Sequence, residues 1–179
     1  MTLELAKKDD YKDFKRLYYS AFPPEERPPY FYLKRRAKKG KGELFIAKDN
    51  GSFVGFIYLV PYLDMVYVFF FAIEESLRYK GYGSKILQLV KERNANKRLF
   101  LAREPLDENA ENAEQRKGRR EFYMKNGFID LPMKIIENHY AFDAMGIGGK
   151  FSAEEYDALI TNFMGKFARK FVEMRVEEL

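Results

Sequence analysis

The spacing of apolar residues predicts a strand, a helix and a hairpin in the first third of the chain. Leu3–Lys7 is typical of a short strand. The apolar residues after it recur at the spacing of one helical face, namely Tyr11, Phe14, Leu17, Tyr18 and Ala21. Two further strand-like runs, 44–48 and 53–59, flank Asn50-Gly51, a dipeptide typical of tight hairpins. The sheet is therefore expected to begin antiparallel.

The longest apolar run, Met65–Ile73, predicts the central strand. It is rich in aromatic and β-branched residues and ends in charge, which is typical of a strand buried on both faces. Beyond a charged turn, Tyr82, Ile86, Leu89 and Val90 recur at helical spacing. Arg98–Ala102 is a short strand after that helix, and a strand-helix-strand unit predicts parallel pairing with Met65–Ile73.

Two glycines, Gly81 and Gly83, lie where the helix after the central strand begins. A helix N-terminus presents unpaired N–H groups and the positive end of the dipole, and glycine lets a bulky anion approach the backbone. A phosphate or pyrophosphate site is therefore predicted. Three common glycine motifs do not fit. The dinucleotide-binding motif lacks its third glycine, the P-loop lacks its spacing, and the RNA-recognition octamer would continue as a strand.

A proline-rich loop and a basic run follow the first helix. Prolines at positions 23, 24, 28 and 29 end that helix and predict a rigid, partly extended loop. Lys34–Lys41 is basic and ends a second predicted helix, and such runs are usually solvated faces. Nucleic-acid binding is the alternative, although no aromatic residue is interleaved to stack a base.

The C-terminal half predicts a closing strand pair and a long helix. Asn126-Gly127 is a helix stop, and strands are expected at Phe128–Leu131 and Ile135–Phe142. Ser152 begins a capping box, and apolar residues then follow one face of an amphipathic helix to about Met174. We expect this face to pack on the sheet, with a dimer interface or a membrane surface as alternatives.

Composition narrows the class of protein. A chain of 179 residues, with 46% hydrophobic and 33% charged residues, is globular and of the size of one domain. Without cysteine it has no disulfide framework, thiolate nucleophile or thiolate zinc site. The net charge of +5 suits a polyanionic partner such as CoA, an acidic substrate or nucleic acid. With no signal-like N-terminus and no run near the roughly 18 residues of a membrane span, a cytoplasmic protein is expected.

Two motifs together resemble the GCN5-related N-acetyltransferase (GNAT) family. Ala72–Gly83 is similar to the end of the family's fourth strand and its pyrophosphate loop, and Phe122–Phe128 is similar to the family's Leu/Phe-Tyr-x-x-x-Gly-Phe. The resemblance covers about residues 3–142, and the C-terminal helix, 151–175, lies outside it. It implies an α/β (α+β) fold with a mixed, mostly antiparallel central sheet flanked by helices. The C-terminal amphipathic helix is an addition, and residues 1–179 are expected to form a single N-acetyltransferase domain.

The resemblance also implies where acetyl-CoA binds. The family's fourth and fifth strands splay apart, and the backbone of Phe71, Ala72 and Ile73 would pair with the pantetheine amides. Arg78 would add charge near the pyrophosphate, which the loop N–H groups would hold. The loop residues are Tyr79, Lys80, Gly81, Tyr82, Gly83 and Ser84. Arg116 stands where the family often has an asparagine that contacts CoA, and Arg116, Arg119 or Arg120 would help to hold CoA or an acidic acceptor.

For catalysis, Tyr123 matches the family tyrosine near the CoA sulfur, which implies a general acid; a packing tyrosine is the alternative. The base stays open, because the apolar run 68–71 replaces the family's strand-four glutamate. Glu104 is one candidate and a water chain is another. The lone His139 is expected to be an ordinary polar strand residue. No metal is implied.

The loop after the first helix forms one wall of the acceptor site in the family, so Glu25, Glu26 and Arg27 are candidate acceptor contacts, unless they merely solvate the loop. The expected function is transfer of acetyl from acetyl-CoA to a primary amine of a small molecule or peptide, by direct attack in a ternary complex. A non-catalytic acyl-CoA-binding sensor and a basic RNA-associated protein are the alternatives. A homodimer is a further expectation left open.

Overall fold

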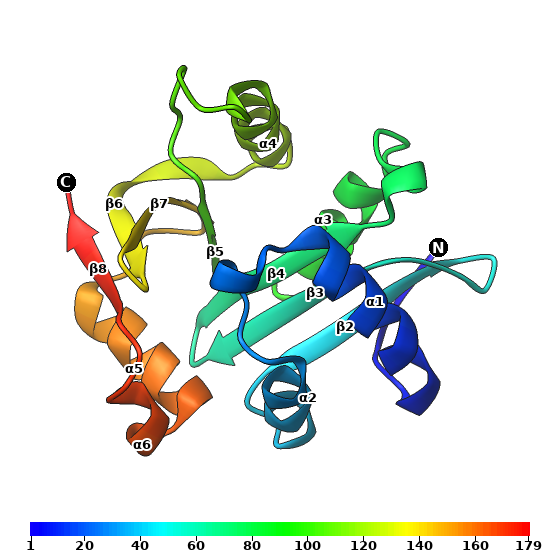
Figure 1. Cartoon of the computed structure of the whole chain (residues 1–179), viewed down its shortest axis with the longest axis horizontal. Helices are drawn as coiled ribbons and strands as arrows, with labels where there is room; N and C mark the ends of the chain where they lie inside the picture. The colour runs from blue at the N-terminus through cyan, green and yellow to red at the C-terminus, as the bar shows by residue number, and fades with distance from the viewer. The chain divides into compact units, whose positions relative to one another are not determined.

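In this computed structural model, the described residues form eight strands that hydrogen-bond in the order β1-β2-β3-β4-β5-β7-β6-β8 (Figure 1). The sheet is mostly antiparallel and is flanked by helices, which confirms the expected fold class. The structure describes residues 1–25 and 27–179. By its contacts the chain divides into two units, residues 1–61 with 68–95 and residues 62–67 with 96–179, and each is described by itself.

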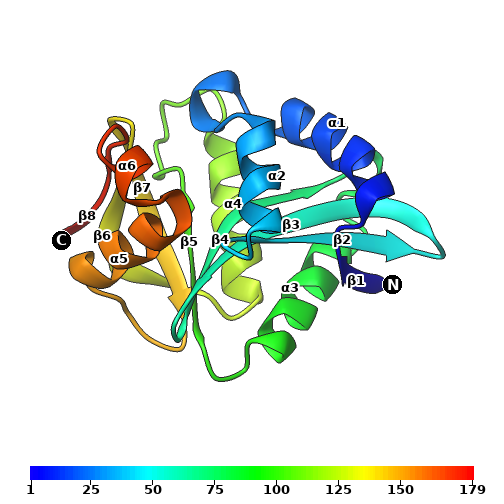
Figure 2. The ribbon, with the colours of Figure 1, turned by 90° about the horizontal axis from the view of Figure 1, so that it is seen from below.

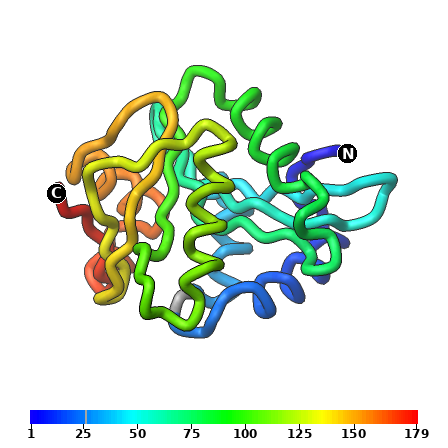
Figure 3. The backbone as a smooth tube through the Cα atoms, turned by 90° about the horizontal axis from the view of Figure 1, so that it is seen from above, coloured from blue at the N-terminus to red at the C-terminus, as the bar shows by residue number. Residues whose placement is uncertain are grey.

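The first unit is a meander of strands with helices on both faces. Its elements are β1 (Thr2–Leu5), α1 (Tyr11–Ala21), α2 (Tyr30–Lys38), β2 (Glu43–Asp49), β3 (Ser52–Tyr62), most of β4 (Met65–Ile73) and α3 (Tyr82–Arg93), with 3₁₀ turns at Lys8–Asp10 and Glu75–Leu77. Helices α1 and α2 lie on one face of its strands and α3 on the other (Figures 2 and 3). The predicted Asn50-Gly51 hairpin is confirmed, since both residues have positive φ, 47° and 79°.

An aromatic cluster fills the first unit beneath α1. Phe14 of α1 packs edge-on against Phe56 of β3, with ring centroids 4.7 Å apart, and Tyr18 meets Phe70 of β4 at 5.2 Å. These rings are almost completely buried, and aromatic pairs of this geometry stabilise cores beyond their buried area. The predicted helical face of α1 is thus the face that enters the core.

The central strand β4 has the predicted limits, Met65–Ile73. Its first four residues are all buried, and after them buried and half-buried residues alternate. The strand is therefore covered on both faces only over its first half, whereas the sequence predicted burial on both faces throughout.

The second unit is an antiparallel sheet covered by α5. Its elements are β5 (Arg98–Arg103), α4 (Ala113–Lys125), β6 (Ile129–Glu137), β7 (Tyr140–Ile147), α5 (Ala153–Met164), α6 (Lys166–Arg169) and β8 (Met174–Glu178), and β4 begins in it. Tyr67 of β4 stacks on Phe100 of β5 with centroids 4.7 Å apart, and Tyr156 of α5 packs against both rings. The capping box at Ser152 is confirmed.

The C-terminal helix is shorter than the sequence predicts. It ends at Met164 because Gly165 has φ 87° and ψ 147°, which no helical residue can adopt. Phe167 and Phe171, which continue the helical spacing, lie exposed beyond this break. The chain then forms an unpredicted strand, β8, which pairs antiparallel with β6.

The predicted strand Ile135–Phe142 is also wrong, because it contains a turn. Asn138 and His139 have φ 48° and 72°, and they join β6 to β7 as a tight hairpin. Asparagine readily adopts a positive φ, but Asn138-His139 lacks the glycine that is the strongest sequence signal of such a turn. The turn was therefore not predicted. His139 is therefore a turn residue rather than a strand residue. Among the described helices, none has the length and apolar character needed to cross a membrane.

Stability should fall in alkaline solution, because burial raises the pKa of four core tyrosines, Tyr18, Tyr58, Tyr67 and Tyr156. A tyrosine whose pKa is higher in the folded than in the unfolded protein stabilises the folded state, and this stabilisation is complete below the unfolded pKa of about 10. The stabilisation is lost as the pH rises from there towards the folded pKa. Each tyrosine should cost about 1.4 kcal/mol at pH 11. Urea unfolding at pH 8 and pH 11 measures the loss, and equal unfolding free energies would contradict it.

Candidate functional site

The loop before α3 ends in an open helix N-terminus. Tyr79 and Gly81 both have positive φ, 62° and 80°, which turns the chain so that Gly81 becomes the N-cap of α3. The Lys85 amide donates to the Gly81 carbonyl at 3.2 Å and closes the first turn of the helix. A Cβ built on Gly81 would meet no atom within 4 Å. The positive end of α3 thus opens onto free space, as an anion site requires.

Three basic residues lie next to this helix end in the sequence. Arg78 and Lys80 carry exposed side chains on the loop, and the Lys85 ammonium lies 5.8 Å from the centre of the Tyr82 ring. Tyr79 has a positive φ, which costs a non-glycine residue about 1–2 kcal/mol. Its side chain is fully exposed, so packing does not offset this cost. Backbone strain held at a solvent-facing loop is typical of a functional segment.

Tyr82 holds the loop by a contact that the sequence did not predict. Its hydroxyl donates to Asp49 Oδ2 at 2.9 Å, which connects the first residue of α3 to the β2–β3 hairpin. This hydrogen bond is the largest cause of a lowered pKa at Asp49. The partners are far apart in sequence, so no local pattern could have shown the contact.

The end of β4, where Phe71, Ala72 and Ile73 were predicted to contact pantetheine, is tightly held. Ala72 is buried, and a Cβ on Gly55 of β3 would lie 2.3 Å from its carbonyl oxygen, so only glycine allows this approach. The Glu74 amide donates to the Val54 carbonyl at 2.9 Å, and Arg16 of α1 pairs with the Glu74 carboxylate. The strand end is thus rigid, and its contact with CoA stays a prediction.

The proposed acceptor residues have different surroundings. Arg27 Nη1 donates to the carbonyls of Tyr19 and Phe22, both at 2.7 Å, and its guanidinium lies 4.5 Å from the centre of the Tyr19 ring. Arg27 therefore closes the end of α1. Glu25 is exposed, and Glu26 lies outside the described residues. Acceptor contact stays a prediction for all three.

In the second unit, Glu104 is the centre of a polar cluster. Asn112 donates to its Oε1 at 3.0 Å, Arg119 donates to its Oε2 at 2.5 Å, and Arg116 lies 3.3 Å from Oε1. Burial alone would raise the pKa of Glu104, but the hydrogen bond from Asn112 and the charges of Arg119 and Arg116 outweigh it and lower the pKa. A carboxylate with a lowered pKa is a weaker base, which counts against the predicted role.

The arginines predicted to hold CoA have protein partners. Arg116 Nε donates to Asn112 Oδ1 at 2.7 Å and its Nη1 donates to the Pro105 carbonyl at 3.0 Å, so Arg116 anchors the preceding loop on α4. Arg120 donates through Nε to Asp130 Oδ2 at 2.9 Å. Contact between these arginines and CoA stays a prediction.

Tyr123 lies in the last turn of α4, whose end is set as predicted. The Phe128 amide donates to the Tyr123 carbonyl at 3.1 Å, and Gly127 has φ 89°. The half-buried Tyr123 ring packs between Phe122 and Phe128, with centroid distances of 5.2 and 5.6 Å. Burial raises the pKa of Tyr123 to about 12, against the opposing charge of Arg119. Its phenol is therefore protonated at neutral pH, as a general acid must be.

Comparison with known proteins decides the family. A family model described as an acetyltransferase (GNAT) domain matches residues 40–130, more than half of the chain, including the α3 loop and the Tyr123 segment. This chain belongs to the GNAT acetyltransferases. The predicted family is thus confirmed. No match was found among curated protein sequences.

Solved structures share the GNAT fold. A GNAT-family protein from Bacteroides thetaiotaomicron is 22% identical, with a TM-score of 0.71 over 94% of this chain and 99% of its own. An aminoglycoside 6′-N-acetyltransferase complexed with coenzyme A is 16% identical, with a TM-score of 0.65 over 82% and 96%. A chimeric spermidine N-acetyltransferase from Vibrio cholerae and hSSAT is 16% identical, with a TM-score of 0.63 over 82% and 93%.

This GNAT chain also contains a buried charge network that sequence reasoning missed. Arg103, at the end of β5, is almost fully buried and lies 3.0 Å from Asp130 of β6 and 3.1 Å from Asp143 of β7. Asp130 also accepts from Arg120, so the network joins α4, which carries Tyr123, to three strands. Its members are distant in sequence, and an arginine at a predicted strand end would ordinarily be solvated.

Replacing Asp130 with asparagine should lower the free energy of unfolding by about 2 kcal/mol, because the buried Arg103 guanidinium loses one of its carboxylates. Asp157→Asn is the matched control. Asp157 also pairs with an arginine, Arg169, but is 59% exposed against 38% for Asp130, so its loss should stay below about 1 kcal/mol. Urea unfolding measures both, and equal losses would contradict the anchoring role.

Proposed function

We propose that this chain transfers an acetyl group from acetyl-CoA to a primary amine by direct attack in a ternary complex. The observation that carries the proposal is the open N-terminus of α3, with Gly81 as its N-cap and the basic residues Arg78, Lys80 and Lys85 next to it in sequence. Such a helix end suits a pyrophosphate, and the chain belongs to a family of acetyltransferases. Two proteins of the same fold act on amines, the aminoglycoside and the spermidine N-acetyltransferases.

In this proposal the backbone N–H groups of residues 79–84 bind the pyrophosphate of the donor. Arg78 and Lys80 add positive charge, and the backbone of 71–73 pairs with the pantetheine arm. Most of the recognition then comes from backbone groups, which the αL turn at Gly81 presents and the Tyr82–Asp49 hydrogen bond holds in place. A preorganised backbone site binds without the entropy cost of ordering long side chains.

The reaction needs a neutral amine, whose nitrogen forms a bond to the thioester carbonyl carbon. The C–S bond then breaks, and the departing thiolate takes a proton from the Tyr123 phenol. The proton that the amine loses passes through a base or water to the Tyr123 phenolate, which becomes a phenol again. Glu104 stays one candidate for that base, although its two arginine partners weaken it, and a water chain is the other. We propose that residues 1–179 act as one N-acetyltransferase domain in the cytoplasm, without a metal.

A non-catalytic acyl-CoA sensor is the second candidate function. It is favoured by the run 68–71, which has no carboxylate where many family members have one. Titration of the protein with acetyl-CoA in a calorimeter tests what the two functions share. Saturable binding is expected for both, and no heat of binding would contradict both. Release of CoA thiol with added amines is expected for the enzyme alone.

A further inference from the structure

The unpredicted strand β8 is an edge strand with one row of backbone groups directed away from the sheet. The Asn138 amide donates to the Glu173 carbonyl at 2.9 Å, and the Leu179 amide donates to the Pro132 carbonyl at 3.0 Å. In an antiparallel ladder, alternate residues bond to the same neighbour, so residues 173, 175, 177 and 179 face β6. The outward row therefore belongs to Met174, Val176 and Glu178, and β8 ends the strand order.

We propose that β8 pairs antiparallel with β8 of a second copy of this chain, about a two-fold axis at Val176. A two-fold axis places equivalent residues symmetrically about it, so the register follows from its centre. Centred at Val176, Arg175 of each copy lies opposite Glu177 of the other, and the outward groups of the two valines bond to each other. The strand is thus complementary to itself in charge, and the outward groups of Val176 complete the pairing at the axis. The Met174 carbonyl, also in the outward row, is already occupied by Arg169.

Neighbouring registers are unfavourable for the same charges. An axis at Arg175 would place two arginines opposite each other, and an axis at Glu177 would place two glutamates opposite each other. Like charges directly opposite destabilise a strand pair. Arg175 and Glu177 already lie 2.6 Å apart within one chain, on one face of β8, so pairing would join two such ion pairs into one network. The charge order therefore selects the Val176-centred register.

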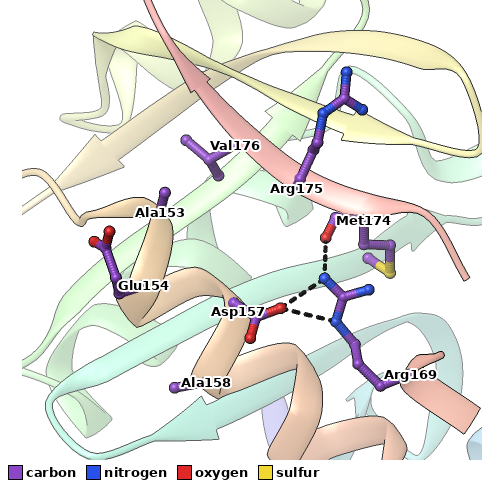
Figure 4. A pocket seen from close by; sticks show the side chains of 8 residues that line it. All are labelled: Ala153, Glu154, Asp157, Ala158, Arg169, Met174, Arg175 and Val176. Carbon is purple, nitrogen blue, oxygen red and sulfur yellow. Dashed lines mark hydrogen bonds and ion pairs between the residues drawn. The ribbon is translucent and has the colours of Figure 1, made fainter.

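Exposed aromatic rings near β8 supply apolar surface for such an interface. Phe167 and Phe171 are 79% and 74% exposed, with ring centroids 5.3 Å apart, just before the strand. A hollow of about 390 Å³ is lined by residues of α5 and β8. Figure 4 shows that Val176 and Arg175 point to opposite sides of the strand. Arg169 donates to the Met174 carbonyl at 2.6 Å and fixes the segment that carries both rings. Charged residues on an edge strand can instead prevent association between copies. The experiment below distinguishes a strand that dimerises from one that is protected in this way.

Charge exchange between two variants tests the proposal. Sedimentation equilibrium of the wild-type chain should show a dimer, and Arg175→Glu and Glu177→Arg should each weaken it by about tenfold or more. In the mixed pair, every glutamate lies opposite an arginine, so an equimolar mixture of the two variants should regain the dimer. A wild-type chain that stays monomeric at about 100 µM would overturn the proposal. So would single variants that dimerise as well as the wild type, or a mixture that stays monomeric.

Val176→Pro tests the register without changing a charge. The Val176 amide faces away from β6, so proline removes an outward donor and leaves the β6–β8 ladder intact. The variant should be monomeric, with a circular dichroism spectrum like that of the wild type. A folded Val176→Pro variant that still dimerises would overturn the pairing at Val176. If the charge variants do not fold, the comparison of Val176→Pro with the wild type still tests whether β8 forms the dimer.

Discussion

Replacing Gly81 with valine should weaken acetyl-CoA binding at least tenfold, a loss of about 1.4 kcal/mol or more. The φ of 80° at this N-cap is strained for any residue with a Cβ and most of all for a β-branched one. A Cβ here would also project into the open space at the α3 N-terminus, where the pyrophosphate is proposed to lie. Calorimetric titration with acetyl-CoA measures the change.

Gly40→Val is the matched control. Gly40 also has a positive φ, 65°, and open space where its Cβ would be, but it follows α2 rather than the loop before α3. Both variants should lose about 1–2 kcal/mol of stability to backbone strain. Only Gly81→Val should lose acetyl-CoA affinity. Wild-type affinity in Gly81→Val, or equal losses in the two variants, would remove the support for a pyrophosphate loop.

Replacing Tyr123 with phenylalanine should lower kcat about a hundredfold while KM for acetyl-CoA stays close to that of the wild type. The ring would still pack between Phe122 and Phe128, so only the proton donor is removed. Steady-state kinetics with a saturating amine measure the effect. Tyr140→Phe is the matched control, because Tyr140 at the start of β7 has an exposed side chain, and it should leave kcat unchanged.

The pH profile gives a second view of the same residue. Because the pKa of Tyr123 is raised to about 12, the phenol keeps its proton throughout the neutral and mildly alkaline range. Titration of Tyr123 should therefore cause no fall in kcat between about pH 8 and 10. An unchanged kcat in Tyr123→Phe would assign this tyrosine to packing.

The features predicted correctly from sequence depend on local signals. The limits of β4 follow from one uninterrupted apolar run, the hairpin from Asn50-Gly51, and the helix stop from Asn126-Gly127. The start of α3 follows from Gly81, which lies directly before residues with helical spacing. In each case neighbouring residues determine the backbone conformation, so a single sequence is sufficient.

The features that were missed depend on distant partners or on a break in a continuing pattern. Phe167 and Phe171 keep the helical spacing after α5, and only Gly165 marks the end of the helix, which concealed β8. The burial of Arg103 depends on Asp130 and Asp143 from two other strands. The protein partners of Glu104 and Arg116 likewise come from folding of the loop onto α4, and they could not be inferred from spacing.

Release of free CoA thiol in the presence of a panel of primary amines is the most direct measurement of acetyl transfer by this chain. With at least one amine, release should rise with amine concentration and saturate, and the amine should gain one acetyl group in its mass spectrum. The rate should fall about a hundredfold in Tyr123→Phe. Saturable acetyl-CoA binding without amine-dependent thiol release would contradict acetyl transfer and favour an acyl-CoA sensor.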